Sequence, residues 1–403
     1  MPTPSELRDA YNAGARSFPQ VQLAGQMLEG IVLNEAFLAR ANLRGVYLCY
    51  SQMVGVNLSQ ANLRYGELVR VNLKQANLSE ADLRGANLLE ANLTRASLFR
   101  AHLDGANLTE ADLAYGNLRQ ASLSGATLSG CNLRAVAMQG AYLARVALAG
   151  ADLGEANLEG TVLTQGELSG VSLTQANLRG ADLAGSNLTR ADLYRADLTG
   201  ANLIRANLTA AELGRACLRQ ACLSAATLNR AMLQGADLNG GEEWTDLSSA
   251  ILTDANLTDA NLQRVNLTRA NLSGAVLMGA DLRGAQLWGT NLTNANLVGA
   301  TLAGTDLRMT TLTDAKMHRC DLSGCNLQGV DLSRRELTGV NFHRADLRGA
   351  NLSRTVLTQA DLMDVLLEGA DLSEADLRGA RLTQQVAGAN LKGARLPNGR
   401  LVA

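Results

Sequence analysis

Residues 81–110 read ADLRG ANLLE ANLTR ASLFR AHLDG ANLTE, with a leucine at every fifth position. The same spacing extends in both directions, and 76 such centres can be counted along the chain. They run from Phe18 to Leu238 and from Leu247 to Leu382, followed by Leu391, Leu396 and Leu401. The usual unit is Ala, then Asp or Asn, then Leu, then two more variable residues.

A period of five fits neither an α-helix nor a β-strand. A helix would spread these leucines around its circumference, and a strand would send successive leucines to opposite faces. The remaining structure is a repeating turn, in which each unit forms one side of a coil and points its leucine inward. The alanine two residues earlier also faces inward, because a narrow bore has room only for a small partner.

The composition agrees with a narrow, uniform interior. The 403 residues include only 3% aromatic residues, whereas an irregular core needs large side chains to fill uneven spaces. Lys and Arg total 36 and Asp and Glu total 38, so the net charge is close to zero. There is no apolar run of 18 residues and no signal-peptide pattern at the start. We expect a cytoplasmic protein with free thiols and no membrane association.

Seventy-six such units resemble the pentapeptide-repeat family, and in particular its long, cyanobacterial-type members. The resemblance covers residues 18–401. It implies a right-handed quadrilateral β-helix, an all-β solenoid with four units in each coil, and therefore about 19 coils here.

The expected organisation is an N-terminal capping helix and lead-in over residues 1–17, followed by one β-helix domain over 18–403. Thr3 and Glu6 form a capping-box pattern, which predicts a helix over residues 4–13. The five-residue phase breaks near 239–246 and near 383–390. A deletion at the first break would put Glu243 at a buried centre, so an outward loop of four inserted residues is favoured. The second break is ambiguous, because Ala387 could also be a centre.

Few residues of this chain could support catalysis or bind a metal ion. The three histidines fall on three different faces, and the aspartates follow the repeat without a calcium-binding frame. We expect no enzyme activity, no cofactor and no metal site. Cys131, Cys320 and Cys325 take the small inward position, whereas Cys49 should be exposed. Arg335 also takes that small position, so its guanidinium needs a partner, a local distortion or an escape at a corner.

Two functions remain open. The first is a protein–protein interaction scaffold with one or more unidentified protein partners, and a homodimer through the C-terminal edge is a further expectation. The second comes from the resemblance, because some relatives mimic a DNA duplex and bind a type II topoisomerase, DNA gyrase. A DNA mimic needs one strongly negative side. Acids and bases are interspersed on every face here, and we expect no direct binding of nucleic acid.

Candidate binding residues are the outward positions that are large or apolar. One group lies near the N-terminus on one face and its two corners: Met27, Tyr47, Cys49, Tyr50, Tyr65, Val69 and Leu89. The other lies at and after the first phase break: Glu242, Glu243, Trp244, Trp288 and Met309. Tyr and Trp are enriched at interfaces. The competing explanation for the first group is that some outward residues are apolar by chance. For the second group, it is that Trp244 folds back and covers the break.

Overall fold

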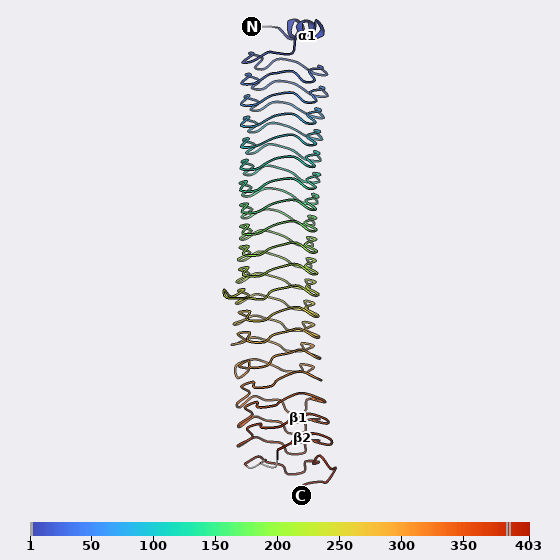
Figure 1. Cartoon of the computed structure of the whole chain (residues 1–403), viewed down its shortest axis with the longest axis vertical. Helices are drawn as coiled ribbons and strands as arrows, with labels where there is room; N and C mark the ends of the chain where they lie inside the picture. The colour runs from blue at the N-terminus through green and yellow to red at the C-terminus, as the bar shows by residue number, and fades with distance from the viewer. Residues whose placement is uncertain (1–2, 384–385, 387) are drawn as a thin grey trace. The chain divides into compact units, whose positions relative to one another are not determined.

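The computed structural model describes residues 3–383, 386 and 388–403. The chain divides into two compact units, Met1–Asn207 and Leu208–Ala403, each of which is a stack of coils (Figure 1). Three short regular elements are present among the described residues: helix α1 (Pro4–Asn12) and strands β1 (Asp361–Leu362) and β2 (Arg381–Leu382). No helix among these residues has the length and apolar character needed to cross a bilayer.

Helix α1 begins at a capping box. Glu6 N donates a hydrogen bond to Thr3 Oγ1, and Thr3 N donates to Glu6 Oε2 at 2.7 Å. Pro4 occupies the first turn, where its missing N–H leaves no hydrogen bond unmade. Leu7 is 1% exposed, and the Tyr11 hydroxyl donates to Asn34 O. The helix therefore contacts the coils that follow it.

In the first unit, each coil takes twenty residues. Parallel backbone bridges join Asn62 to Asp82 and Asp82 to His102. Asp82 N donates to Ala61 O at 2.9 Å, and Leu83 N donates to His102 O at 2.7 Å. Twenty residues contain four five-residue units, so units twenty residues apart stack on one face, and each coil has four sides.

A tight turn separates each side of a coil from the next. After Leu83 it is closed by a hydrogen bond from Ala86 N to Leu83 O at 2.9 Å. Its second central residue, here Gly85 with φ 65°, is left-handed, and we call this position the corner. The Asp or Asn before the leucine supports the turn, since Asp82 Oδ1 accepts from Arg84 N. Either residue type can accept this bond, which explains why they alternate freely.

The leucine centres fill the bore of the coils. Every centre from Leu23 to Leu377 is 4% exposed or less. The prediction that all centres are buried is nevertheless wrong at the two ends of the repeat. Phe18, which follows α1 and has a coil on only one side, is half-buried, as are Leu382, Leu391 and Leu396. Leu401 is 58% exposed because the chain turns back and pairs antiparallel with Arg395, rather than completing another coil.

In the second unit, the register between coils changes twice. Cys222 pairs with Asp246 and Asp237 with Asn261, so 24 residues separate partners across the first break. The spacing returns to twenty at the pair Asp246–Asn266, which is the pattern that four inserted residues produce. At the second break, Asp371 pairs with Asn390 and the spacing is 19. Ala387, the alternative centre, lies outside the described residues. Between the two breaks, β1 and β2 pair in parallel in the twenty-residue register.

Candidate protein-binding surfaces

The first candidate surface lies on the early coils of the first unit. Met27 and Tyr47 pair as backbone neighbours in adjacent coils and are 60% and 42% exposed. Tyr50 and Tyr65 occupy the two flanking corners and are also exposed. The other three predicted members, Cys49, Val69 and Leu89, are half-buried. Cys49 was expected to be exposed, but its Sγ lies 3.6 Å from Glu67 O of the next coil.

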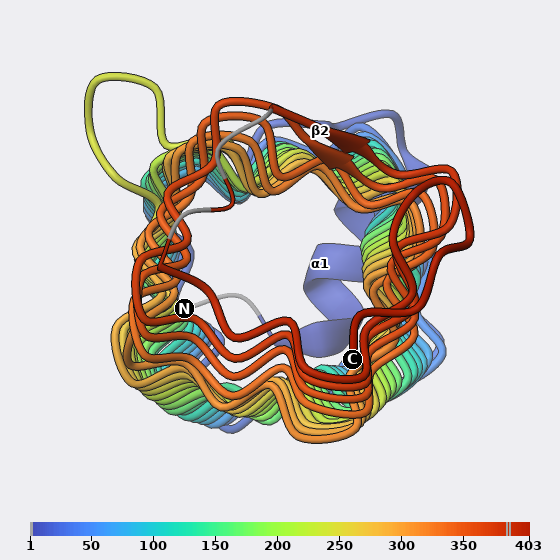
Figure 2. The ribbon, with the colours of Figure 1, turned by 90° about the horizontal axis from the view of Figure 1, so that it is seen from below.

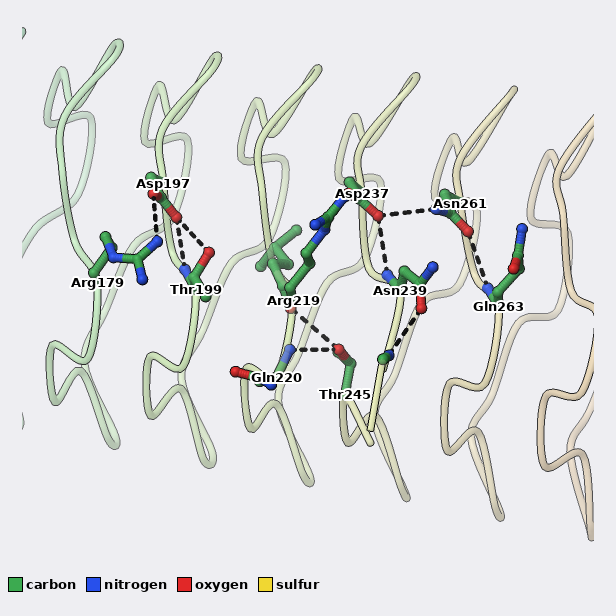
Figure 3. A network of polar contacts seen from close by, with 12 residues as sticks. Arg179, Asp197, Thr199, Arg219, Gln220, Asp237, Asn239, Thr245, Asn261 and Gln263 are labelled. Atoms are coloured by element: carbon green, nitrogen blue, oxygen red, sulfur yellow. Dashed lines mark hydrogen bonds and ion pairs between the residues drawn. The ribbon is translucent and has the colours of Figure 1, made fainter. Parts of the chain in front are cut away.

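The loop at the first break spans residues 239–244 and projects away from the neighbouring coils of the second unit (Figure 2). Gly240 is the exception, because it is buried and its N donates to Gln263 O of the next coil. The base of this loop is held by polar contacts (Figure 3). Asp237 Oδ1 accepts from Asn239 N at 3.1 Å, and Asn239 Oδ1 accepts from Gly241 N at 2.8 Å. Arg264 Nη1 donates to Gly241 O at 3.2 Å. Glu242 and Glu243 are exposed, so the loop presents two carboxylates to solvent.

Thr245, not Trp244, fills the interior at the break. Thr245 is 0% exposed and takes the small inward position two residues before Leu247. Its Oγ1 accepts from Gln220 N at 2.9 Å and donates to Leu218 O at 3.3 Å. Trp244 is 45% exposed. The exposure of Trp244 and the burial of Thr245 disagree with the explanation in which Trp244 covers the break in the repeat.

Trp288 and Met309 project from the face that begins at Leu247. Backbone pairing runs from Asp246 to Asn266 to Gln286, so Trp288 stands two coils after the break on that face. Met309 follows one coil later at a corner, and both side chains are 53% exposed. The structure thus places the members of the second group within four coils of one unit, with none in the coil of Leu267.

The repeat pattern itself identifies the family of the chain. The family model described as pentapeptide repeats, with 8 copies, matches residues 28–64, 67–105, 91–130, 101–140, 128–165, 141–180, 167–203, 186–224, 206–240, 243–279, 280–319, 315–354 and 345–384. The chain belongs to the pentapeptide-repeat family. Pentapeptide repeats form right-handed quadrilateral β-helices, and the four-sided, twenty-residue coils of both units agree with that architecture.

Solved structures of other pentapeptide-repeat proteins are distant from this chain. QnrB1, a plasmid-mediated fluoroquinolone resistance protein, is 20% identical over 50% of this chain and 91% of its own, with a TM-score of 0.28. HetL from the cyanobacterium Nostoc sp. strain PCC 7120, involved in heterocyst differentiation regulation, is 23% identical over 100% of both chains, with a TM-score of 0.13. Rfr23 from the cyanobacterium Cyanothece 51142 is 26% identical over 35% of this chain and 90% of its own, with a TM-score of 0.11. No curated protein sequence matches the chain.

Many carboxylates of this pentapeptide-repeat protein are paired with arginines. When Asp precedes a leucine and Arg follows it, the two side chains meet, as in Asp346 with Arg348 at 2.7 Å. The Arg348 guanidinium lowers the pKa of the Asp346 carboxyl to about 2. The same arrangement recurs at Asp82, Asp281, Asp306 and Asp376. Within the part of the chain that the structure describes, no group of three or more His, Cys, Asp or Glu side chains could hold a metal ion.

Arg335 departs from the pentapeptide pattern and finds a partner. Its side chain is 18% exposed, and Nη1 lies 2.9 Å from Asp314 Oδ1 at a corner of the preceding coil. The Arg335 Nε is buried without a hydrogen-bond partner. The turn bond from Arg335 N to Leu332 O is 3.4 Å long, close to the 3.3 Å of the equivalent bond from Thr355 N to Leu352 O. The guanidinium therefore has a partner at a corner, and the turn that carries it keeps its hydrogen bond.

The cysteines at the small inward position behave as small apolar residues. Cys131, Cys320 and Cys325 are buried, and each Sγ donates to a leucine carbonyl of the preceding coil. Burial raises the pKa of Cys131 and of Cys320 to about 12. All six cysteines are free thiols.

Two features were missed from the sequence. Thr245 reads as an ordinary loop residue unless the four-residue insertion is assigned first. A row of arginines, Arg44, Arg64 and Arg84, stands on one face of the first unit. This row is visible only when residues twenty positions apart are compared one by one. The net charge summed over the whole face hides it, because acidic residues in later coils offset the three arginines.

Proposed function

We propose that this pentapeptide-repeat protein is a non-enzymatic, cytoplasmic scaffold that binds one or more proteins through the outward residues of its coils. The observation that carries the proposal is the group of exposed large side chains on the early coils, Met27, Tyr47, Tyr50 and Tyr65. Elsewhere the outward positions are mostly small or polar. Tyrosines combine apolar area with a polar tip and are favoured at protein interfaces.

Affinity capture from the native host with mass spectrometry tests this proposal. The wild-type chain is compared with Tyr47→Ser plus Tyr65→Ser. A matched control is Tyr142→Ser plus Tyr194→Ser, which removes two exposed tyrosines from later coils of the same unit. We expect at least one partner to be lost with the first pair and kept with the control. If every partner is recovered at full affinity with all variants, the early surface is not the binding site.

The loop at the first break is a second binding element in this proposal. Trp244, Glu242 and Glu243 are exposed in it, and Trp288 and Met309 follow on the adjoining face. Trp244→Ala should lower the melting temperature by no more than about 1 °C, because Thr245 fills the interior, yet it should weaken binding of a partner. A large loss of stability with every partner retained would contradict a binding role for this loop.

Mimicry of DNA toward a type II topoisomerase is the alternative, and the projecting loop is the feature in its favour. The pairing of carboxylates with arginines counts against it, because paired acids do not present a strongly negative side. A DNA gyrase supercoiling assay separates the two functions. Inhibition at stoichiometric protein would favour mimicry, and no inhibition at large excess would favour the scaffold.

We further propose that residues 18–403 form one repeat domain of about 19 coils, with breaks near 239–246 and 383–390 and with α1 as its N-terminal cap. The burial of Leu7 and the contact of Tyr11 with Asn34 support the capping role. A homodimer through the C-terminal edge remains a prediction. Sedimentation equilibrium of the wild-type chain and of Leu401→Glu tests it, since a dimer that depends on this edge should dissociate in the variant.

A further inference from the structure

Three arginines stand in one row on the first unit. Arg44, Arg64 and Arg84 each follow a leucine centre, and each lies twenty residues from the next. The residues two positions before them pair in sequence, Asn42 with Asn62 and Asn62 with Asp82. The three side chains therefore leave the same face in consecutive coils, about 4.8 Å apart.

The charge of this row is only partly compensated. Arg84 makes a bidentate ion pair with Asp82, with atom separations of 2.8 and 2.6 Å. Arg64 Nε lies 3.9 Å from the same carboxylate, and Arg44 has no carboxylate partner among the described residues. Asp104, the next residue of the row, accepts from Ser124 N and Ser122 Oγ instead. Three guanidinium groups thus have one carboxylate within ion-pair distance, while Asp104 adds a more distant negative charge beside Arg84. Like charges at the spacing of the row repel one another.

Tyr65 joins this row to the apolar residues around the corner. The Tyr65 ring lies against Gly85, where an added Cβ would stand 2.8 Å from two ring carbons. The Arg64 and Arg44 guanidinium carbons lie 5.4 and 5.8 Å from the ring centre. Beyond this corner, Met27 and Tyr47 form a short exposed apolar column in adjacent coils. Glu67 continues this column in the next coil, where it is half-buried and accepts from Asn87 Nδ2. The arginine row and the apolar residues therefore lie on two sides of one corner, with Arg44 beside Tyr47 in one coil and Arg64 beside Tyr65 in the next.

We propose that this arginine–tyrosine surface, made of Met27, Arg44, Tyr47, Arg64, Tyr65 and Arg84, binds an amphipathic α-helix of a partner protein. The helix carries Glu or Asp along one stripe and apolar residues along the next, and it lies parallel to the stacking direction of the coils. The acids meet the arginine row, and the apolar stripe covers Tyr65, Tyr47 and Met27. This inference rests on the proposed scaffold function and names the chemistry of its partner.

The spacing of the row favours a helix over an extended strand. Successive turns of an α-helix are about 5.4 Å apart, and successive coils are about 4.8 Å apart. Over the two intervals between three arginines, the positions on the helix and on the coils therefore differ by about 1 Å in total. Alternate residues of a strand are about 6.7 Å apart, so over the same two intervals their positions would differ from those of the arginines by about 4 Å. Arginine side chains can absorb the smaller mismatch. An apolar column beside the charges also favours a protein partner over a nucleic acid strand.

A designed peptide provides the direct test. The probe is a fluorescein-labelled, alanine-rich 18-residue helix with Glu at i, i+4, i+7 and i+11 and Leu on the adjacent stripe. Its binding to the full-length protein is followed by fluorescence anisotropy. We expect Arg44→Glu plus Arg64→Glu to weaken binding at least tenfold. Arg145→Glu plus Arg190→Glu makes the same change of net charge at exposed corners elsewhere in the unit and should change binding less than twofold.

Two further measurements identify the cause of any loss of peptide binding. The same peptide with Lys in place of Glu should bind the Arg44→Glu plus Arg64→Glu protein better than it binds the wild type. Arg44→Gln plus Arg64→Gln is a milder variant that should weaken the Glu peptide severalfold, and circular dichroism verifies that each variant is folded. Equal loss in the Arg145 and Arg190 control, or equal competition by a single-stranded DNA of the same charge, would overturn the proposal.

An absence of peptide binding would also overturn the helix proposal. It would leave the scaffold function standing, because that function is judged by host partners lost with Tyr47→Ser plus Tyr65→Ser. Conversely, if the peptide binds but no host partner is recovered, the scaffold function is contradicted. The conclusion that this surface binds an acidic amphipathic helix would still stand.

Discussion

The Thr245 hydroxyl accepts a hydrogen bond from Gln220 N at 2.9 Å, which connects the end of the inserted loop to the coil before it. Both atoms lie where the stacking would otherwise be interrupted by four additional residues. Thr245 is fully buried, whereas Gln220 is exposed, so this bond lies at the boundary between the interior and the solvent. One hydroxyl therefore restores at the break the backbone pairing that the repeat makes elsewhere without side chains.

Thr245→Val should lower the free energy of unfolding by about 1–1.5 kcal/mol, because it removes the side-chain acceptor of Gln220 N. Thr290→Val is the matched control. The Thr290 hydroxyl only donates to Leu267 O, which already accepts from Ala270 N, so its loss should cost less than about 1 kcal/mol. Urea unfolding followed by circular dichroism measures both variants. Equal costs would show that the acceptor role of Thr245 is unimportant.

Arg335→Ala should raise the free energy of unfolding by about 1–3 kcal/mol. The substitution restores the small inward residue of the repeat, and it removes a guanidinium whose Nε is buried without a hydrogen-bond partner. Asp314→Ala should have the opposite effect, at about 1 kcal/mol, because it leaves the guanidinium unpaired. Thermal unfolding of the two variants shows whether each substitution raises or lowers the stability of the protein. Destabilisation by Arg335→Ala would contradict this account.

Asp346→Asn should lower stability at pH 7 by about 1 kcal/mol, since it removes the charge that the Arg348 guanidinium stabilises. The pKa of this carboxyl falls from 3.8 to about 2 in the folded protein. A lowered pKa gives stability that is present above pH 3.8 and is lost as the pH falls toward 2. The difference between variant and wild type should therefore vanish over that interval in unfolding measurements, and a constant difference would exclude the ion pair as its cause.

Thiol labelling should separate the cysteines by burial. Cys131, Cys320 and Cys325 should resist a disulfide reagent at pH 8 in the folded protein and react in urea, as mapped by mass spectrometry. Burial raises the pKa of the Cys131 thiol from 9.0 to about 12, so its contribution to stability is complete below pH 9 and is lost as the pH rises toward 12. Rapid labelling of Cys131 in the native state would show that the coils open locally.

The sequence alone predicts the interior of the repeat almost residue by residue. A five-residue phase fixes which side chains point inward, and the centres from Leu23 to Leu377 follow it. It also predicts the insertion at the first break, since Glu243 cannot occupy a buried centre, and the structure leaves Glu243 exposed. The phase fails at Leu401, because the return of the chain depends on pairing with Arg395 and not on the repeat.

The candidate surfaces were only partly predictable. The exposure of Tyr47 and Tyr65 follows from their phase, but the half-burial of Cys49 depends on how the next coil covers it. Arg335 could be recognised as an exception, yet its pairing with Asp314 required the geometry of a corner in another coil. Side-chain contacts across coils combine residues about twenty positions apart, and they depend on rotamers that a linear pattern does not specify.

The return of the register to twenty residues directly after the loop has a practical consequence. The four additional residues change the path of the chain only at one corner, and the pair Asp246–Asn266 stacks as though nothing had been added. Because the entropy of loop closure grows only slowly with length, foreign sequences of moderate size grafted between Gly241 and Trp244 should leave the neighbouring coils in place. This corner is therefore a natural position at which to display an epitope or a reporter on a rigid support.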